Sequence, residues 1–161
     1  MTARTPLSHE AIERELGSLV ERSSQSFGMP VLELRTDNLI ALVTGLRERF
    51  QFTLFLDVTA VDYPERSPRF DVVYHFYSHR HNQRIRLKVR VPAQQPVVPT
   101  LIGQYGSARY MEREVHDMYG IEFAGNEDLR PILLYEGFVG HPLRKDYPIE
   151  HEQPVVTYRT G

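Results

Sequence analysis

Four charged side chains lie within two turns of a predicted helix and could support acid–base chemistry. They are Glu112, Arg113, Glu114 and Asp117. Glu114 and Asp117 stand about one turn apart, as a general acid and a general base could. No neighbouring residue supplies a nucleophile, because Ser107 lacks the strand–turn–helix setting of a catalytic serine. We therefore expect a structural charge network with Arg113 as its hub, since one guanidinium group can bind two carboxylates.

The spacing on this helix also predicts two side-chain pairs. Arg113 and Asp117 are four residues apart, as are Glu112 and His116, and residues at this spacing are neighbours on a helix surface. The di-iron helix motif places glutamate and histidine three apart instead. No second histidine or cysteine pair completes a zinc set. We expect no metal site in this chain.

Composition narrows the possible functions further. The 161 residues include no cysteine, which excludes disulfides and argues against a redox centre held by this chain alone. The net charge of −2 gives no general attraction to nucleic acid or anionic lipid. The chain contains no dinucleotide-binding glycine motif and no P-loop. The apolar runs at 39–46 and 54–61 are too short to span a bilayer, so another chain would have to hold this one at a membrane.

Apolar residues at helical spacing predict three helices that frame this charged segment. They cover residues 9–23, 38–50 and 107–119. Ser8 is expected to cap the first helix, and Thr36 or Asp37 the second. Gly120 should end the third, because glycine readily adopts the left-handed conformation that stops a helix.

Four segments have the composition of strands. They are residues 31–35, 52–61, 70–78 and 84–91, with a hairpin turn at 79–83. The nearly continuous apolar run of 52–61 predicts a strand covered on both sides. These elements favour an α+β fold: a small, mostly antiparallel sheet with helices packed on one face, followed by an extended C-terminal strap. We place the α+β domain at 1–106 and the helix with its partner-binding strap at 107–161, within the same domain unit.

The strand at 84–90 supports an alternative from another functional class. It alternates apolar residues with basic ones, and the basic residues are Arg84, Arg86, Lys88 and Arg90. A basic strand in a small sheet occurs in RNA-binding platforms. The aromatic signature of such platforms is missing here. A nucleic-acid-binding module that uses this strand therefore remains the competing hypothesis.

The segment after Gly120 contains too many apolar groups for a flexible linker and too many Pro and Gly breaks for a core. Extended backbone cannot satisfy its own N–H and C=O groups, so another surface must supply their partners. Tyr135, Phe138, Arg144 and Tyr147 are of the types enriched at protein interfaces. We expect a neighbouring polypeptide to complete the strap. The alternative is that its first half folds back onto its own domain.

Three sequences in this region resemble a known family. They are EREVHDMYGIEF at 112–123, DLRPIL at 128–133 and GHPLRKDYP at 140–148. Together with the strands near 60–64, 70–76 and 86–92, they resemble the C subunit of the respiratory NADH:quinone oxidoreductase, complex I. The sequence departs from the family pattern at His116, Asn126 and Pro131. Membrane-bound hydrogenases and related dehydrogenases contain equivalent subunits, so these remain a second identification.

The resemblance implies a non-catalytic, cofactor-free subunit of the peripheral arm of a proton-translocating enzyme. It would lie on the cytoplasmic side of a bacterial membrane against the D subunit, and also near the B and I subunits. NADH, FMN, iron–sulfur clusters and quinone would bind to other subunits. The matching residues are expected to form the partner interface and the charge network. They are Glu112, Arg113, Glu114, Asp117, Asp128, Arg130, His141, Arg144, Asp146 and Tyr147.

Overall fold

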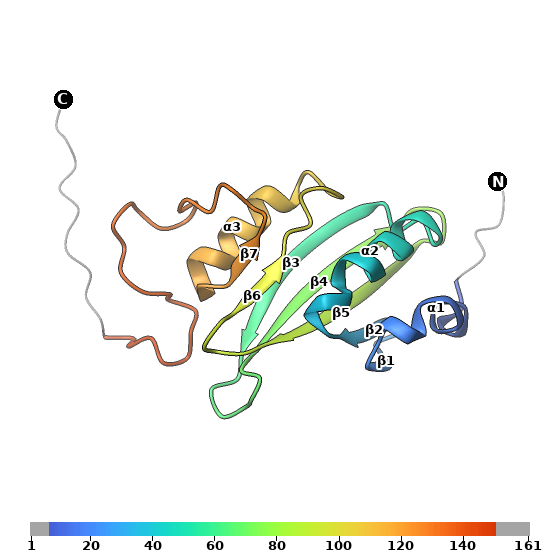
Figure 1. Cartoon of the computed structure of the whole chain (residues 1–161), viewed down its shortest axis with the longest axis horizontal. Coiled ribbons are helices and arrows are strands. Elements are labelled where there is room, and N and C mark those ends of the chain that lie inside the picture. Colours follow the sequence, from blue (N-terminus) through green and yellow to red (C-terminus); the bar gives the residue numbers. More distant parts are fainter. Residues whose placement is uncertain (1–6, 151–161) are drawn as a thin grey trace.

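A five-stranded sheet forms the centre of the computed structural model, which describes residues 7–150 (Figure 1). In the order in which they lie side by side, its strands are β1 (Arg22–Ser26), β2 (Met29–Leu34), β5 (Gln83–Val91), β4 (Phe70–Ser78) and β3 (Leu54–Asp62). Only β2 and β5 are parallel; the other neighbouring strands are antiparallel. The predicted α+β class with a mostly antiparallel sheet is confirmed.

Three α-helices bury their apolar residues in one core on one face of this sheet. They are α1 (His9–Leu16), α2 (Leu39–Glu48) and α3 (Ala108–Tyr119). This core includes Leu42 and Leu46 of α2, Val115 of α3, and Leu87 and Tyr74 of the sheet. The opposite face, which we call the open face, carries the alternate residues of the same strands, including Arg84 and Arg86 of β5.

The predicted α3 and β4 agree closely with the structure, because apolar periodicity defines both. Other boundaries are wrong. The first helix stops at Leu16, and a 3-10 turn (Gly17–Leu19) follows it. Residues 22–26, expected to be helical in part, form β1 because they pair with β2 through a two-residue turn. Ser8 caps α1 as expected, and its side chain accepts a hydrogen bond from the Ala11 N–H. The second helix has no side-chain cap, since Thr36–Asn38 forms a 3-10 turn before α2.

β3 also differs from its prediction. It is an edge strand, and its alternate residues are half-exposed or exposed rather than covered on both sides. Leu54 and Val61, which made the sequence look continuously apolar, lie on the open face. An apolar run alone therefore did not distinguish a buried strand from an edge strand with apolar residues facing outward.

A short parallel pair of strands positions α3 against the sheet. β6 (Val97–Pro99) precedes the helix, and β7 (Glu122–Ala124), which the sequence did not predict, follows it and pairs with β6. Gly120 ends α3 in the left-handed conformation with φ +68°, as expected, and lets the chain return. From here on the strap means residues 125–150; residues 151–161 of the predicted strap lie outside the described residues. The strap contains no helix or strand and runs as an irregular loop beside α3, drawn orange to red in Figure 1.

Candidate partner-binding site

Asp117 of α3 fixes the first half of the strap. Its Oδ2 accepts hydrogen bonds from the backbone N–H groups of Ile132, Leu133 and Leu134, at 2.7, 3.0 and 3.4 Å. The carboxylate is buried, and hydrogen bonds to an ionised acceptor are stronger than those between neutral groups. Asp117 thereby satisfies the donors of an irregular, bent segment that has no strand partner.

Arg113, one turn earlier on α3, binds the carbonyl groups of the same segment. Its Nε donates to the carbonyl oxygen of Arg130 at 2.9 Å, and Nη2 donates to that of Pro131 at 2.8 Å. Among the described residues, its ion pair is with Asp128, at 4.0 Å. The predicted Arg113–Asp117 pair and the carboxylate hub at Arg113 are therefore wrong. The two side chains bind opposite backbone groups of the strap instead of each other.

The second half of the strap caps the C-terminal end of α3. The last carbonyl groups of a helix have no partner within the helix and need donors from elsewhere. Here the strap supplies three donors to backbone carbonyl oxygens. His141 Nδ1 donates to the carbonyl oxygen of Asp117 at 3.0 Å, and the Leu143 N–H donates to that of Met118 at 3.1 Å. Arg144 Nε donates to the carbonyl oxygen of Tyr119 at 2.6 Å. A Cβ atom at Gly120 would clash with Nε2 of His141. Glycine is thus required at this close approach.

The end of the strap is held by the β3–β4 connection. Arg69 binds both oxygens of the Asp62 carboxylate at 2.7 Å and the carboxylate of Asp146 at 2.8 Å. Asp62 also accepts the Lys145 N–H at 2.7 Å. The hydrogen bonds from Arg69 hold the pKa values of both carboxyl groups below the usual aspartate range. Arg69 is the guanidinium hub that binds two carboxylates, a role the sequence analysis assigned to Arg113.

Glu112 belongs to a separate buried network. Its carboxylate accepts hydrogen bonds from Thr100 Oγ1 at 2.7 Å, the Leu101 N–H at 2.8 Å and Asn126 Nδ2 at 3.0 Å. The residue is fully buried, and burial raises its pKa despite these three bonds. The predicted Glu112–His116 pair is wrong, because His116 Nδ1 lies 3.0 Å from the Ile121 carbonyl oxygen instead.

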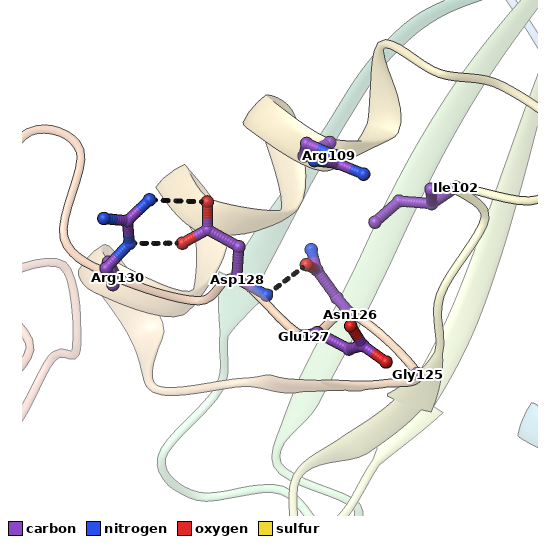
Figure 2. A pocket seen from close by; sticks show the side chains of 7 residues that line it. All are labelled: Ile102, Arg109, Gly125, Asn126, Glu127, Asp128 and Arg130. Atoms are coloured by element: carbon purple, nitrogen blue, oxygen red, sulfur yellow. Dashed lines mark hydrogen bonds and ion pairs between the residues drawn. The ribbon is translucent and has the colours of Figure 1, made fainter.

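The acid–base pair considered from the sequence is not formed. Asp117 is committed to the strap, whereas Glu114 is exposed on α3. A cavity of about 460 Å³ does lie nearby, between the first turns of α3 and the start of the strap (Figure 2). Asp128 and Arg130 on its rim form a two-bond ion pair at 2.7 and 3.0 Å, and this pair lowers the pKa of Asp128 to about 2. The side chains that line the cavity include no serine, threonine, cysteine, lysine or histidine, and the Asp128 carboxylate is paired with Arg130.

The predicted basic strand lies on the open face. Arg90 forms an ion pair with Glu33, and Arg86 donates to His75 Nε2 at 2.8 Å. Burial and the nearby Arg86 lower the pKa of His75, which fits its role as an acceptor. Two of the four basic side chains thus interact with neighbouring side chains of this chain.

Within residues 7–150, no group of three or more metal-binding side chains is found, and no helix is long and apolar enough to cross a membrane.

Six large apolar side chains of the strap are exposed. Leu133 is 61% exposed and Val139 is 72% exposed, and four further apolar residues are also exposed. They are Ile132, Tyr135, Leu143 and Ile149. Phe138 packs between Tyr135 and Tyr147, with ring centroids at 5.4 and 6.2 Å. Many polar groups of the strap therefore bind its own domain while six large apolar side chains stay exposed, and exposed apolar groups of this kind are typical of a protein interface.

The structure brings most of the predicted site residues together along the strap. Those that join it to the domain are Arg113, Asp117, Asp128, Arg130, His141, Arg144 and Asp146. Tyr147 belongs to the aromatic cluster, Glu112 to the buried network, and Glu114 to neither. Sequence reasoning missed Asp62, Arg69 and Thr100. The expectation that a neighbouring polypeptide supplies the partners of the strap's backbone N–H groups is wrong for residues 132–134, 143 and 145, because the chain's own domain supplies them.

Comparison with known proteins places the chain in a family. Residues 32–153 match the family described as respiratory-chain NADH dehydrogenase, 30 Kd subunit. The C subunit of the NADH-quinone oxidoreductase of Sinorhizobium medicae (strain WSM419) is 49% identical over 140 residues, 86% of this chain and 69% of that protein. The C 1 subunit of the same enzyme in Rhizobium meliloti (strain 1021) is 47% identical over 135 residues, 83% of this chain and 67% of that protein.

Two solved structures have a similar fold. The trypsin-resistant fragment (1–134) of Nqo5 has a TM-score of 0.67 at 27% identity, over 74% of this chain and 97% of that one. A chain of the membrane-bound sulfane sulfur reductase, an archaeal respiratory membrane complex, has a TM-score of 0.76 at 24% identity, over 88% and 85%. The second likeness concerns the fold alone. The chain therefore belongs to the family of the 30 kDa subunit of respiratory-chain NADH dehydrogenase, the C-subunit family of the peripheral arm of complex I.

Proposed function

We propose that this chain is a structural subunit whose strap binds a neighbouring subunit of the peripheral arm, chiefly the D subunit and also the B and I subunits. The observation that carries the proposal is the arrangement of the strap. Many of its polar groups are used by contacts to its own domain, and apolar residues such as Leu133 and Val139 are held exposed. Fully burying one such side chain stabilises a complex by roughly 1.5–3 kcal/mol.

The anchors of the strap make this surface ready to bind. Residues 130–134 are held by Arg113 and Asp117, and residues 141–146 by the end of α3 and by Arg69. Ordering a flexible segment on binding would cost free energy for each residue fixed. A strap already held in place avoids most of that cost, so its apolar contacts contribute more fully to affinity.

The proposal assigns no catalytic residue and no cofactor to this chain. NADH, FMN, the iron–sulfur clusters and quinone would bind to other subunits, on the cytoplasmic side of the membrane. The absence of cysteine supports this assignment, since thiolates are the usual ligands of such clusters. The commitment of Asp117 to three N–H groups supports it too, because that carboxylate is not available as a base.

The proposal is tested by making the strap's outer surface polar. The double variant Leu133→Asp, Val139→Asp should lower the amount of the D subunit that co-purifies with the tagged chain from native membranes by about tenfold or more. Because both side chains are exposed, the melting temperature of the purified chain should not change. Ile40→Asp, on exposed α2 surface, is the matched control and should co-purify normally.

Turnover measured per assembled complex distinguishes a structural role of this chain from a catalytic one. NADH:quinone turnover per assembled complex should stay normal in Arg113→Ala and Arg144→Ala, while the amount of complex falls. Normal assembly combined with lost turnover in these variants would contradict a structural role.

A further inference from the structure

The turn between β1 and β2 carries an aromatic side chain at a position that usually takes a small polar one. Phe27 and Gly28 both have positive φ, +51° and +76°. Two-residue turns of this kind favour Asn-Gly, because few other residues tolerate the left-handed conformation. Among residues 7–150, the Phe27 side chain is fully exposed. Neither the turn nor the core of this chain explains a phenylalanine here.

Phe27 borders a groove across one end of the open face. The groove has a volume of about 570 Å³, and its apolar lining includes Met29, Leu54 and Leu56. Tyr77 of β4 also lines it and pairs in register with Leu54 of β3. These side chains form one apolar surface that the three α-helices do not use, since their buried residues lie on the other face.

The β4–β5 hairpin, which lies between β2 and β3 in the sheet, also lines the groove. Asn82 of the β4–β5 turn has a φ of +50°, and its Oδ1 accepts a hydrogen bond from the Tyr77 hydroxyl at 2.5 Å. The Tyr77 ring also packs edge-on against His79, with centroids 4.9 Å apart. The groove is thus preformed, and its tyrosine ring is already engaged rather than free to stack on a nucleic-acid base.

The charge of the open face points to an acidic ligand. Arg84 lines the groove, and Arg86 and Lys88 follow it along β5. Of the acidic residues on this face of the five strands, Glu33 pairs with Arg90 and Asp71 with Arg66, which leaves Asp57. The unpaired positive charge therefore exceeds the unpaired negative charge beside an apolar groove.

We propose that this groove binds a segment of another protein that offers a carboxylate to Arg84 and an apolar side chain to the surface around Phe27. A protein segment fits better than a nucleic acid, because the apolar part of the lining is chiefly aliphatic. The β4–β5 turn lies at the end of the sheet opposite the strap (Figure 1). The chain would then contact two neighbours through two separate surfaces. The groove is the second surface and is additional to the strap, on which the function proposed above depends.

Site-specific cross-linking tests the inference in the assembled complex. A photoreactive phenylalanine analogue replaces Phe27 in the tagged full-length chain, native membranes are irradiated, and the cross-linked peptide is identified by mass spectrometry. We expect a cross-link to a different polypeptide, at a segment with an aspartate or glutamate next to apolar residues. The same analogue at Ile40 is the control and should not give this product.

Charge reversal provides the second arm. Arg84→Glu should lower the yield of the position-27 cross-link by about tenfold or more, as loss of an interface anchor does. Arg35→Glu, another exposed arginine that lies outside the groove, should leave the yield unchanged. Equal effects of the two reversals would overturn the inference.

The remaining outcomes also decide it. The inference fails if position 27 cross-links to lipid, nucleic acid or a second copy of this chain, or gives no product in a complex that co-purifies normally. That last result would leave the function proposed for the strap standing, so the two proposals fail separately.

Discussion

The β4–β5 hairpin and the strap both adopt one defined conformation, yet different contacts order them. The hairpin buries a continuous apolar face that includes Tyr74, Phe76 and Leu87. The strap buries polar contacts and leaves most of its large apolar side chains outside. Burial of apolar area is non-directional and tolerant, whereas a hydrogen-bonded strap depends on a few specific donors and acceptors. A single substitution that removes one of the strap's polar anchors should therefore release the strap but leave the hairpin folded.

The largest expected effect comes from the sheet. Phe76→Ala removes a fully buried ring that packs against Phe55 and Tyr105 at centroid distances of 5.1 and 5.4 Å. It should lower the free energy of unfolding by about 3–5 kcal/mol. Hydrogen exchange should rise in the sheet and the strap together. Val139→Ala on the exposed strap surface should change stability by less than about 0.5 kcal/mol.

Removal of a strap anchor should separate the two regions. Asp117→Ala leaves the N–H groups of Ile132, Leu133 and Leu134 without their acceptor, at a cost of about 1–3 kcal/mol. Exchange of those three amides should accelerate while β4 and β5 stay protected. Glu114→Ala, an exposed carboxylate on the same helix, should alter neither. Equal loss of protection in β4 would show that the strap and sheet form one cooperative unit.

A comparison of alanine substitutions at Gly120 and Gly137 tests the close approach of the strap to the end of α3. Gly120→Ala places a methyl group against His141 in a left-handed residue, whereas Gly137→Ala meets nothing within 4 Å at a similarly positive φ. Both should lose about 1–2 kcal/mol from the backbone conformation. Only Gly120→Ala should also free residues 141–144, observed as faster exchange of the Leu143 amide. Indistinguishable exchange in the two variants would remove the steric argument.

A fall in pH should release the end of the strap, which Arg69, Asp62 and Asp146 hold, before it affects the core. The pKa values of Asp62 and Asp146 lie below the ordinary 3.8 in the folded chain, chiefly because of Arg69. A lowered folded pKa stabilises at pH above the unfolded value, and this contribution is lost as pH falls below about 4. Amide exchange at Lys145 should rise over that range, after correction for the intrinsic rate. Asp146→Asn should show a smaller pH dependence, and an unchanged one would contradict the assignment.

The sequence predicted the parts of the molecule that local periodicity controls. β4, β5 and α3 follow apolar residues at regular spacing, and the stop at Gly120 follows from glycine's left-handed conformation. β1 escaped prediction because Arg-Ser-Ser-Gln-Ser has no strand pattern of its own and depends on its pairing with β2.

The site was predicted only as a segment, not as a set of contacts. Helical spacing suggested that Arg113 would bind Asp117, but both residues bind backbone groups more than ten positions away. The true hub, Arg69, lies 77 residues from Asp146, and no local pattern connects them. The family motifs did indicate which polar residues gather there, although not which atoms they bind.

Because the strap caps the C-terminal end of α3, that helix must fold before the second half of the strap can be fixed in place. His141, Leu143 and Arg144 bind carbonyl oxygens that point out of the helix only after its last turn has formed. A chain in which this helix is unformed has no fixed acceptors for those donors, so its exposed apolar side chains are not arrayed together. If the strap binds a neighbouring subunit as proposed, only a copy in which α3 has folded presents that binding surface.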